Sequence, residues 1–170
     1  PVAATPTAAA RAAQAVAALA DSVHAAPACT YLSAIAGWTG ITVGWVGDSR
    51  AYWIPEEGTP TLLTEDDVAV PGLLVAWLGA DAGTIPARVT AFHPQAPGTL
   101  LLCSDGLWRY LPEPAALRTV VPAGPPLAVA RRLLRHALDC GGRDNITIAL
   151  IPVATAESPT APVPRIGRQS

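Results

Sequence analysis

At the centre of the chain, residues Leu100–Trp108 read LLLCSDGLW, and the four apolar residues at the start predict a short strand buried on both faces. The strand ends at Ser104-Asp105-Gly106, where the glycine allows the backbone to turn sharply. The Asp105 carboxylate would then project from the edge of a sheet. A carboxylate in that position needs a cation, a hydrogen-bond donor or water, because an unpaired buried charge is unfavourable.

Two other carboxylates have the same setting. Asp48 follows the apolar run Ile41–Val46, and Asp144 precedes the run Asn145–Val153. If the three strand ends meet on one rim, their oxygen-only ligands favour Mg²⁺ or Mn²⁺ over zinc. Three independent turn caps would leave the same pattern, because Asp is common in turns. The spacing alone leaves both interpretations open.

Length and composition restrict the class of protein. The 170 residues are 51% hydrophobic, which is enough for the core of one domain. The net charge of -2 and the absence of lysine argue against nucleic-acid binding. The longest apolar run, Val68–Ala80, is interrupted by Pro71 and Gly72, so no membrane insertion is predicted.

The cysteines and histidines give no metal pattern of their own. The cysteines have neither disulfide nor zinc spacing and are interpreted as reduced core thiols of a cytoplasmic protein. The histidines are interpreted as structural or surface residues. These residues are Cys29, Cys103, Cys140, His24, His93 and His136.

The apolar pattern divides the chain into three parts. Residues 1–27 form an Ala-rich segment with a predicted helix over Ala8–Ala26, residues 28–153 contain every strand signal, and residues 154–170 predict a disordered tail. The predicted strands are Cys29–Ala36, Ile41–Val46, Arg50–Ile54, Thr61–Leu63, Arg88–Phe92, Leu100–Cys103 and Asn145–Val153.

Helical signals are fewer. Short helices are predicted at Leu73–Leu78, from Leu107, and over Pro112–Val120. The clearest helix is Leu127–Leu138, with a predicted apolar face of Leu127, Ala130, Leu134, Ala137 and Leu138. The segment Thr64-Glu65-Asp66-Asp67 is interpreted as a solvated turn with a capping threonine.

Five blocks together resemble the metal-dependent serine/threonine protein phosphatases of the type 2C, or PPM, family. In chain order they are VGDSRAY at 46–52, LTED at 63–66, WLG at 77–79, LCSDGLW at 102–108 and GRDNIT at 142–147. They follow the order of the family over roughly residues 28–152. The three Asp-bearing blocks carry most of the specificity. The richness in Ala and Pro, with Arg in place of Lys, is typical of a GC-rich bacterial genome.

The resemblance implies an α+β fold, the four-layer αββα sandwich, with a two-metal centre at one edge and the domain spanning 28–153. Asp105 and Asp144 would bind one catalytic Mn²⁺ or Mg²⁺, and Asp48 would share a third, weaker ion with Asp105. The supporting residues would be Gly106, Gly142, Asn145 and Arg50, the last anchoring the Asp48 loop.

The family reaction is hydrolysis of phosphoserine and phosphothreonine by a water held between two cations. The resemblance therefore implies phosphorylated protein substrates of serine/threonine kinases and a role in signal transduction.

Two departures qualify this expectation. The family's first metal block, Asp-Gly-x-Gly-Gly, and its early arginine are absent from the sequence, so we expect a partial sandwich without its N-terminal strands, and little activity from this chain alone. Only Asp67–Ala76 separates LTED from WLG, which predicts a very short flap. The alternative function is a non-catalytic, phosphatase-like module that binds a partner or regulates it.

Overall fold

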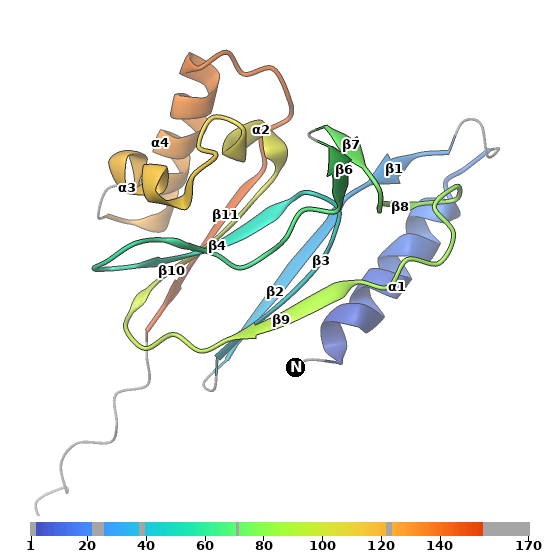
Figure 1. Cartoon of the computed structure of the whole chain (residues 1–170), viewed down its shortest axis with the longest axis horizontal. Helices are drawn as coiled ribbons and strands as arrows, with labels where there is room; N and C mark the ends of the chain where they lie inside the picture. Colours follow the sequence, from blue (N-terminus) through green and yellow to red (C-terminus); the bar gives the residue numbers. More distant parts are fainter. Residues whose placement is uncertain (1–2, 22–25, 38–39, 71, 122–123, 155–170) are drawn as a thin grey trace, which may run out of the picture.

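The computed structural model describes residues 3–21, 26–37, 40–70, 72–121 and 124–154. It contains two antiparallel sheets with helices outside each of them, in the layer order α, β, β, α (Figure 1). The predicted tail from residue 155 onward and His24 lie outside the described residues.

The first sheet has the strand order β11-β10-β4-β5. Its strands are β4 (Arg50–Pro55), β5 (Thr61–Leu62), β10 (Gly98–Cys103) and β11 (Ile148–Val153). Its outer face is covered by four helical segments: α2 (Asp105–Trp108), η1 (Pro114–Ala116), α3 (Leu117–Val120) and α4 (Pro126–Asp139).

The second sheet has the order β2-β3-β9. Its strands are β2 (Tyr31–Gly37), β3 (Gly40–Val46) and β9 (Arg88–Phe92), and the helix α1 (Ala4–Ala17) packs against it. Two small ladders complete the described structure. In one, β1 (Ala28–Cys29) pairs with β8 (Leu78–Gly79), and in the other, β6 (Val68–Val70) pairs with β7 (Leu73–Leu74).

The central strands β4 and β10 are buried on both faces, as the apolar run at 100–103 predicts. Alternate residues face opposite cores because successive side chains in a strand point to opposite sides. Trp53 and Leu100 pack between the two sheets, whereas Tyr52 and Leu101 pack under the helices. The sandwich therefore has two cores that share one sheet.

The strand register brings three turns to one edge of this sheet. In β10, Cys103 lies opposite Arg50 of β4 on one side and Ile148 of β11 on the other. Because both pairings are antiparallel, the start of β4, the end of β10 and the start of β11 lie at the same end. The turns at 47–49, 104–106 and 141–147 therefore meet at that edge.

The prediction for the buried face of the helix α4 was right for Ala137 and wrong for its three leucines. Val129, Leu133 and Ala137 are buried, whereas Leu127, Leu134 and Leu138 are exposed by 63%, 39% and 55%. The helix has two apolar rows, and its 3.6-residue period does not tell which row meets the sheet. The row at 129, 133 and 137 packs in the core under α2 and the sheet, and α4 itself lies against β11.

Two other segments that were predicted as helices differ from the prediction in the structure. Leu73–Leu78 is not helical, because Gly72, with φ of 86°, turns the chain between β6 and β7. The first helix runs over Ala4–Ala17 instead of Ala8–Ala26. Its buried residues Thr5 and Ala9 are small, so helix α1 lies close to the sheet without the large apolar side chains that usually mark a packed helix.

The core-thiol interpretation holds for one cysteine only. Cys103 is buried, and burial raises the pKa of its thiol to about 12. Cys29 and Cys140 are exposed, so the prediction was wrong for these two. Within the described residues, no helix has the length and apolar character needed to cross a bilayer.

The two leucines in the middle of α4 provide a matched test of its buried face. Leu133→Ala should lower the free energy of unfolding by about 3 kcal/mol, because it opens a cavity at a fully buried position. Leu134→Ala should lower it by less than about 1 kcal/mol, because that side chain is partly in solvent already. Urea unfolding of the two variants checks this, and equal losses would contradict the assigned face.

Candidate functional site

The site lies at the edge where the turns after β3, β10 and α4 meet. Asp48 lies in the turn between β3 and β4, next to Gly47, whose φ of 102° favours glycine. Asp105 is the first residue of α2, directly after β10. Asp144 lies between α4 and β11, in a turn that includes Gly142 with φ of 53°. Each predicted carboxylate therefore follows or precedes a strand of the same sheet.

The Asp105 turn and the Asp144 turn are in direct contact. The Ser104 hydroxyl donates to the Asn145 carbonyl at 3.1 Å and accepts from the Thr147 amide at 3.0 Å. A Cβ atom on Gly106 would lie 2.2 Å from the Asn145 carbonyl oxygen, so only glycine fits between the turns. Asp144 itself is exposed, and its Oδ1 accepts from the Asn145 amide at 2.8 Å.

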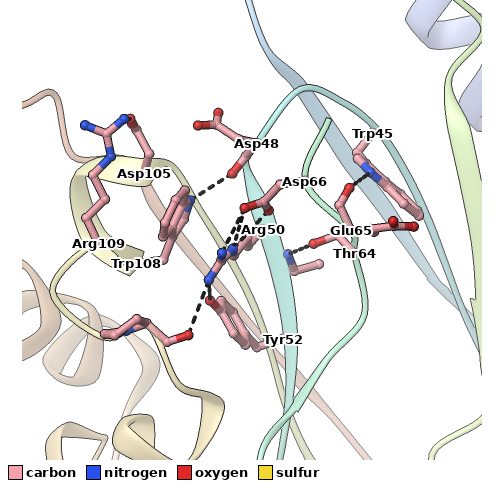
Figure 2. A network of polar contacts seen from close by, with 12 residues as sticks. Trp45, Asp48, Arg50, Tyr52, Thr64, Glu65, Asp66, Asp105, Trp108 and Arg109 are labelled. Atoms are coloured by element: carbon pink, nitrogen blue, oxygen red, sulfur yellow. Dashed lines mark hydrogen bonds and ion pairs between the residues drawn. The ribbon is translucent and has the colours of Figure 1, made fainter. Parts of the chain in front are cut away.

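Asp48 and Asp105 interact electrostatically. Asp48 is only 8% exposed, and its pKa is raised, first by burial and then by the negative charge of Asp105. Asp105 forms an ion pair with Arg109, with 2.8 Å between Oδ2 and Nη2. Figure 2 shows these three side chains together at one end of the polar network. The rim therefore holds two neighbouring carboxylates with one guanidinium beside them.

A second part of the site, centred on Arg50, holds the Asp48 loop in place. Arg50 binds Asp66 through Nε and Nη2, at 3.0 and 2.8 Å, and donates to the Tyr52 hydroxyl at 3.2 Å (Figure 2). Its guanidinium lies over the Trp108 ring, 3.7 Å from the centroid. The Trp108 indole in turn donates to the Asp48 carbonyl at 2.8 Å. These contacts connect β4, the segment after β5, and α2.

In this network the pKa values of Arg50 and Tyr52 are both raised. Burial alone would lower the pKa of Arg50, but hydrogen bonds to Asp66 and Tyr52 outweigh it and raise that pKa. Burial raises the pKa of Tyr52 to about 12, although the neighbouring Arg50 opposes the rise. Arg50 therefore stays charged and fixed, and the structure places it in the framework of the site.

The interpretation of residues 64–67 as a solvated turn was wrong. Thr64 and Asp67 are 7% and 6% exposed, and the Thr64 hydroxyl accepts from the Ala51 amide at 3.2 Å. Asp67 accepts from the Gly47 amide at 2.9 Å and pairs with Arg88 at 2.8 Å. Only the Glu65 side chain is exposed. The sequence contained a signal in Arg50, which begins a strand that is otherwise apolar and therefore needs an acidic partner.

The donor set at the rim suits a hard cation. Asp48 and Asp105 supply carboxylate oxygens, and Mg²⁺ or Mn²⁺ commonly binds one or two carboxylates and completes its shell with water. Within the described ranges, no three His, Cys, Asp or Glu side chains are placed to hold a metal together. The described histidines, His93 and His136, lie outside this edge, at the end of β9 and in α4.

Comparisons with known proteins show what the chain as a whole resembles. No family model matches the chain. The Listeria welshimeri serine/threonine phosphatase stp is 29% identical over 142 residues, which cover 72% of this chain and 55% of that protein. The chain is a homologue of the bacterial serine/threonine phosphatases. The resemblance to type 2C phosphatases is thereby confirmed, and the chain spans about half the length of this relative.

Other relatives agree. PstP of Mycobacterium tuberculosis is 31% identical over 134 residues, covering 64% of this phosphatase homologue and 24% of PstP. The structure of PppA from Pseudomonas aeruginosa superposes with a TM-score of 0.65 at 27% identity, over 74% of this chain and 56% of PppA. A crystal structure of the PstP catalytic domain with two manganese ions gives a TM-score of 0.62 at 22% identity, over 74% of this chain and 58% of that domain. The predicted αββα fold class is confirmed.

The contact between the two turns of the phosphatase homologue can be tested at Gly106. Gly106→Ala should lower the free energy of unfolding by about 1–3 kcal/mol, because the new methyl group forces the Asn145 backbone away. Gly37→Ala is the control, since the nearest atom to its added Cβ is 3.9 Å away. Denaturant unfolding measures both variants. A neutral Gly106→Ala would contradict the close approach of the turns.

The crowding of Asp48 predicts a pH-dependent gain in stability. A raised carboxyl pKa in the folded state stabilises the fold below the ordinary pKa of Asp, and this contribution is lost as the pH rises through the raised value. At pH 7 without divalent cations, Asp48→Asn should therefore melt at a higher temperature than the parent, and near pH 3 the difference should vanish. Asp21→Asn, at an exposed position, is the control. A lower melting temperature for Asp48→Asn at pH 7 would contradict the argument.

Proposed function

We propose that the protein is a serine/threonine protein phosphatase that requires Mn²⁺ or Mg²⁺ and hydrolyses phosphoserine and phosphothreonine in other proteins. The supporting observation is that three Asp-bearing turns meet at one edge of the central sheet. Its homology to stp and PstP supports the reaction class. The substrates would be phosphoproteins made by serine/threonine kinases, in bacterial signalling within the cytoplasm, and the catalytic domain would include residues 28–153.

The roles proposed for the site residues combine the resemblance to the type 2C family with the positions of these residues at the rim. Asp105 and Asp144, from adjoining turns, would hold a catalytic cation, and Asp48 would share a further cation with Asp105. Bound divalent cations supply charge that stabilises the phosphoryl group and lowers the pKa of an attacking water.

The supporting residues would position those carboxylates. Gly106 sets the distance between the Asp105 and Asp144 turns, because a larger residue would separate them. Gly142 and Asn145 shape the turn that presents Asp144. Arg50 would hold Trp108, and through its indole the Asp48 carbonyl, at a fixed place on the rim.

A second candidate is a phosphatase-like module that binds a phosphoprotein or another partner without turnover. One observation favours it: the described residues lack a three-ligand metal group, and Arg109 already pairs with Asp105. Such a module would bind a phosphothreonine peptide and release no phosphate from it.

Phosphate release from a phosphothreonine peptide distinguishes the two candidates. The assay compares the protein as its gene encodes it with the 170-residue chain, in Mn²⁺ and in chelator. We expect Mn²⁺-dependent turnover by the encoded protein and activity near background for the 170-residue chain. Peptide binding without any phosphate release by the encoded protein would favour the second candidate.

Substitutions in the encoded protein test the individual carboxylates. Asp105→Asn and Asp144→Asn should each reduce turnover on the order of a hundredfold at saturating Mn²⁺, because each removes an anionic ligand of the cation that would position and ionise the attacking water. Asp48→Asn should have a smaller effect. Asp139→Asn, an exposed acid at the end of α4, is the matched control. Near-normal turnover by the first two variants, together with lower melting temperatures, would show that these residues are turn caps.

A further inference from the structure

Arg109 forms an ion pair with Asp105, a carboxylate that the proposed function assigns to a cation. It follows Trp108 at the end of α2, four residues after Asp105. Its Nη2 lies 2.8 Å from Asp105 Oδ2. The positive charge of Arg109 also reaches Asp48, where it opposes the effect of the Asp105 charge. One guanidinium therefore partly neutralises both carboxylates of the pair.

The two arginines beside Trp108 differ in how firmly they are held. Arg50 is 14% exposed, makes several hydrogen bonds and lies 3.7 Å from the ring centroid. Arg109 is 47% exposed, and its guanidinium lies 5.9 Å from the same centroid. The ion pair with Asp105 is the only one that Arg109 makes within the described part of the chain. A half-exposed pair of this kind contributes little energy and exchanges readily.

We propose that Arg109 is a built-in counter-ion that competes with a divalent cation for the Asp105 carboxylate. A divalent cation between Asp48 and Asp105 would displace the guanidinium, because the two positive charges repel each other at contact distance. Arg109 thereby lowers the cation affinity of the rim below the value that the two carboxylates alone would give. The relevance to catalysis rests on the proposed phosphatase function, whereas the competition itself is a property of binding.

The test is a Mn²⁺ titration of the 170-residue chain, with free Mn²⁺ measured by electron paramagnetic resonance at low salt. Arg109→Gln should lower the Kd about three- to tenfold, since it removes the competing charge and keeps a polar side chain of similar length. Arg109→Ala should give the same gain. Arg109→Lys, which keeps a cation, and Arg11→Gln, which makes the same charge change on α1, should bind like the parent.

The location of the gain is tested with a double variant and with salt. Adding Asp105→Asn to Arg109→Gln should abolish the gain, and raising the salt concentration should reduce it, because screening weakens the guanidinium's effect. Unchanged or weaker Mn²⁺ binding by Arg109→Gln overturns the proposal, as does a lack of measurable binding by parent and variant alike. Tighter binding without phosphatase activity in the encoded protein supports the proposal and counts against the proposed function.

Discussion

The contact between Arg50 and Asp66 is the interaction on which the arrangement of this edge depends. Arg50 begins the central strand β4 and is largely buried, and a buried guanidinium is tolerated only when acidic and polar partners surround it. Those partners come from separate segments: Asp66 follows β5, Tyr52 belongs to β4, and the Trp108 ring comes from α2. One charge therefore fixes how the helix after β10 lies against the turn that carries Asp48.

Much of the fold could be predicted from local patterns. Arg88–Phe92 matches β9, and the apolar run at 100–103 correctly predicts a strand between two cores. These predictions succeed because strand periodicity and glycine-containing turns are local properties of the chain. Local patterns do not tell which strand ends lie side by side. The resemblance to the type 2C family supplied that expectation. The assignment of individual ligands at that edge is a proposal, because proximity in the fold does not by itself define a metal shell.

The features that sequence reasoning missed depend on contacts between distant residues. Asp66 and Asp67 appear as surface acids until their partners, Arg50 and Arg88, are known, and these lie 16 and 21 residues away in the sequence. In α4, two rows of apolar residues have the same period, so only packing against the sheet and α2 selects the row that contains Leu133. In α1, the small buried residues Thr5 and Ala9 carry no strong hydrophobic signal, although they let the helix lie directly against the sheet, with Thr5 next to Gly44.

The charges at this edge fall into two groups with different surroundings. The framework acids Asp66 and Asp67 each face an arginine in a close ion pair and are nearly enclosed. Among the candidate ligands, Asp105 pairs with Arg109, which is half-exposed like the Arg88 partner of Asp67, and within the described residues Asp48 and Asp144 take part in no ion pair. If these carboxylates served only to stabilise the fold, the two that lie closest to each other would be expected to have the strongest ion pairs with arginines, because like charges repel. Here the crowded pair, Asp48 and Asp105, is the less neutralised one, although the rigid Arg50 network lies next to it. The framework thus holds like charges together at the rim, which is the electrostatic condition that a cation-binding edge requires.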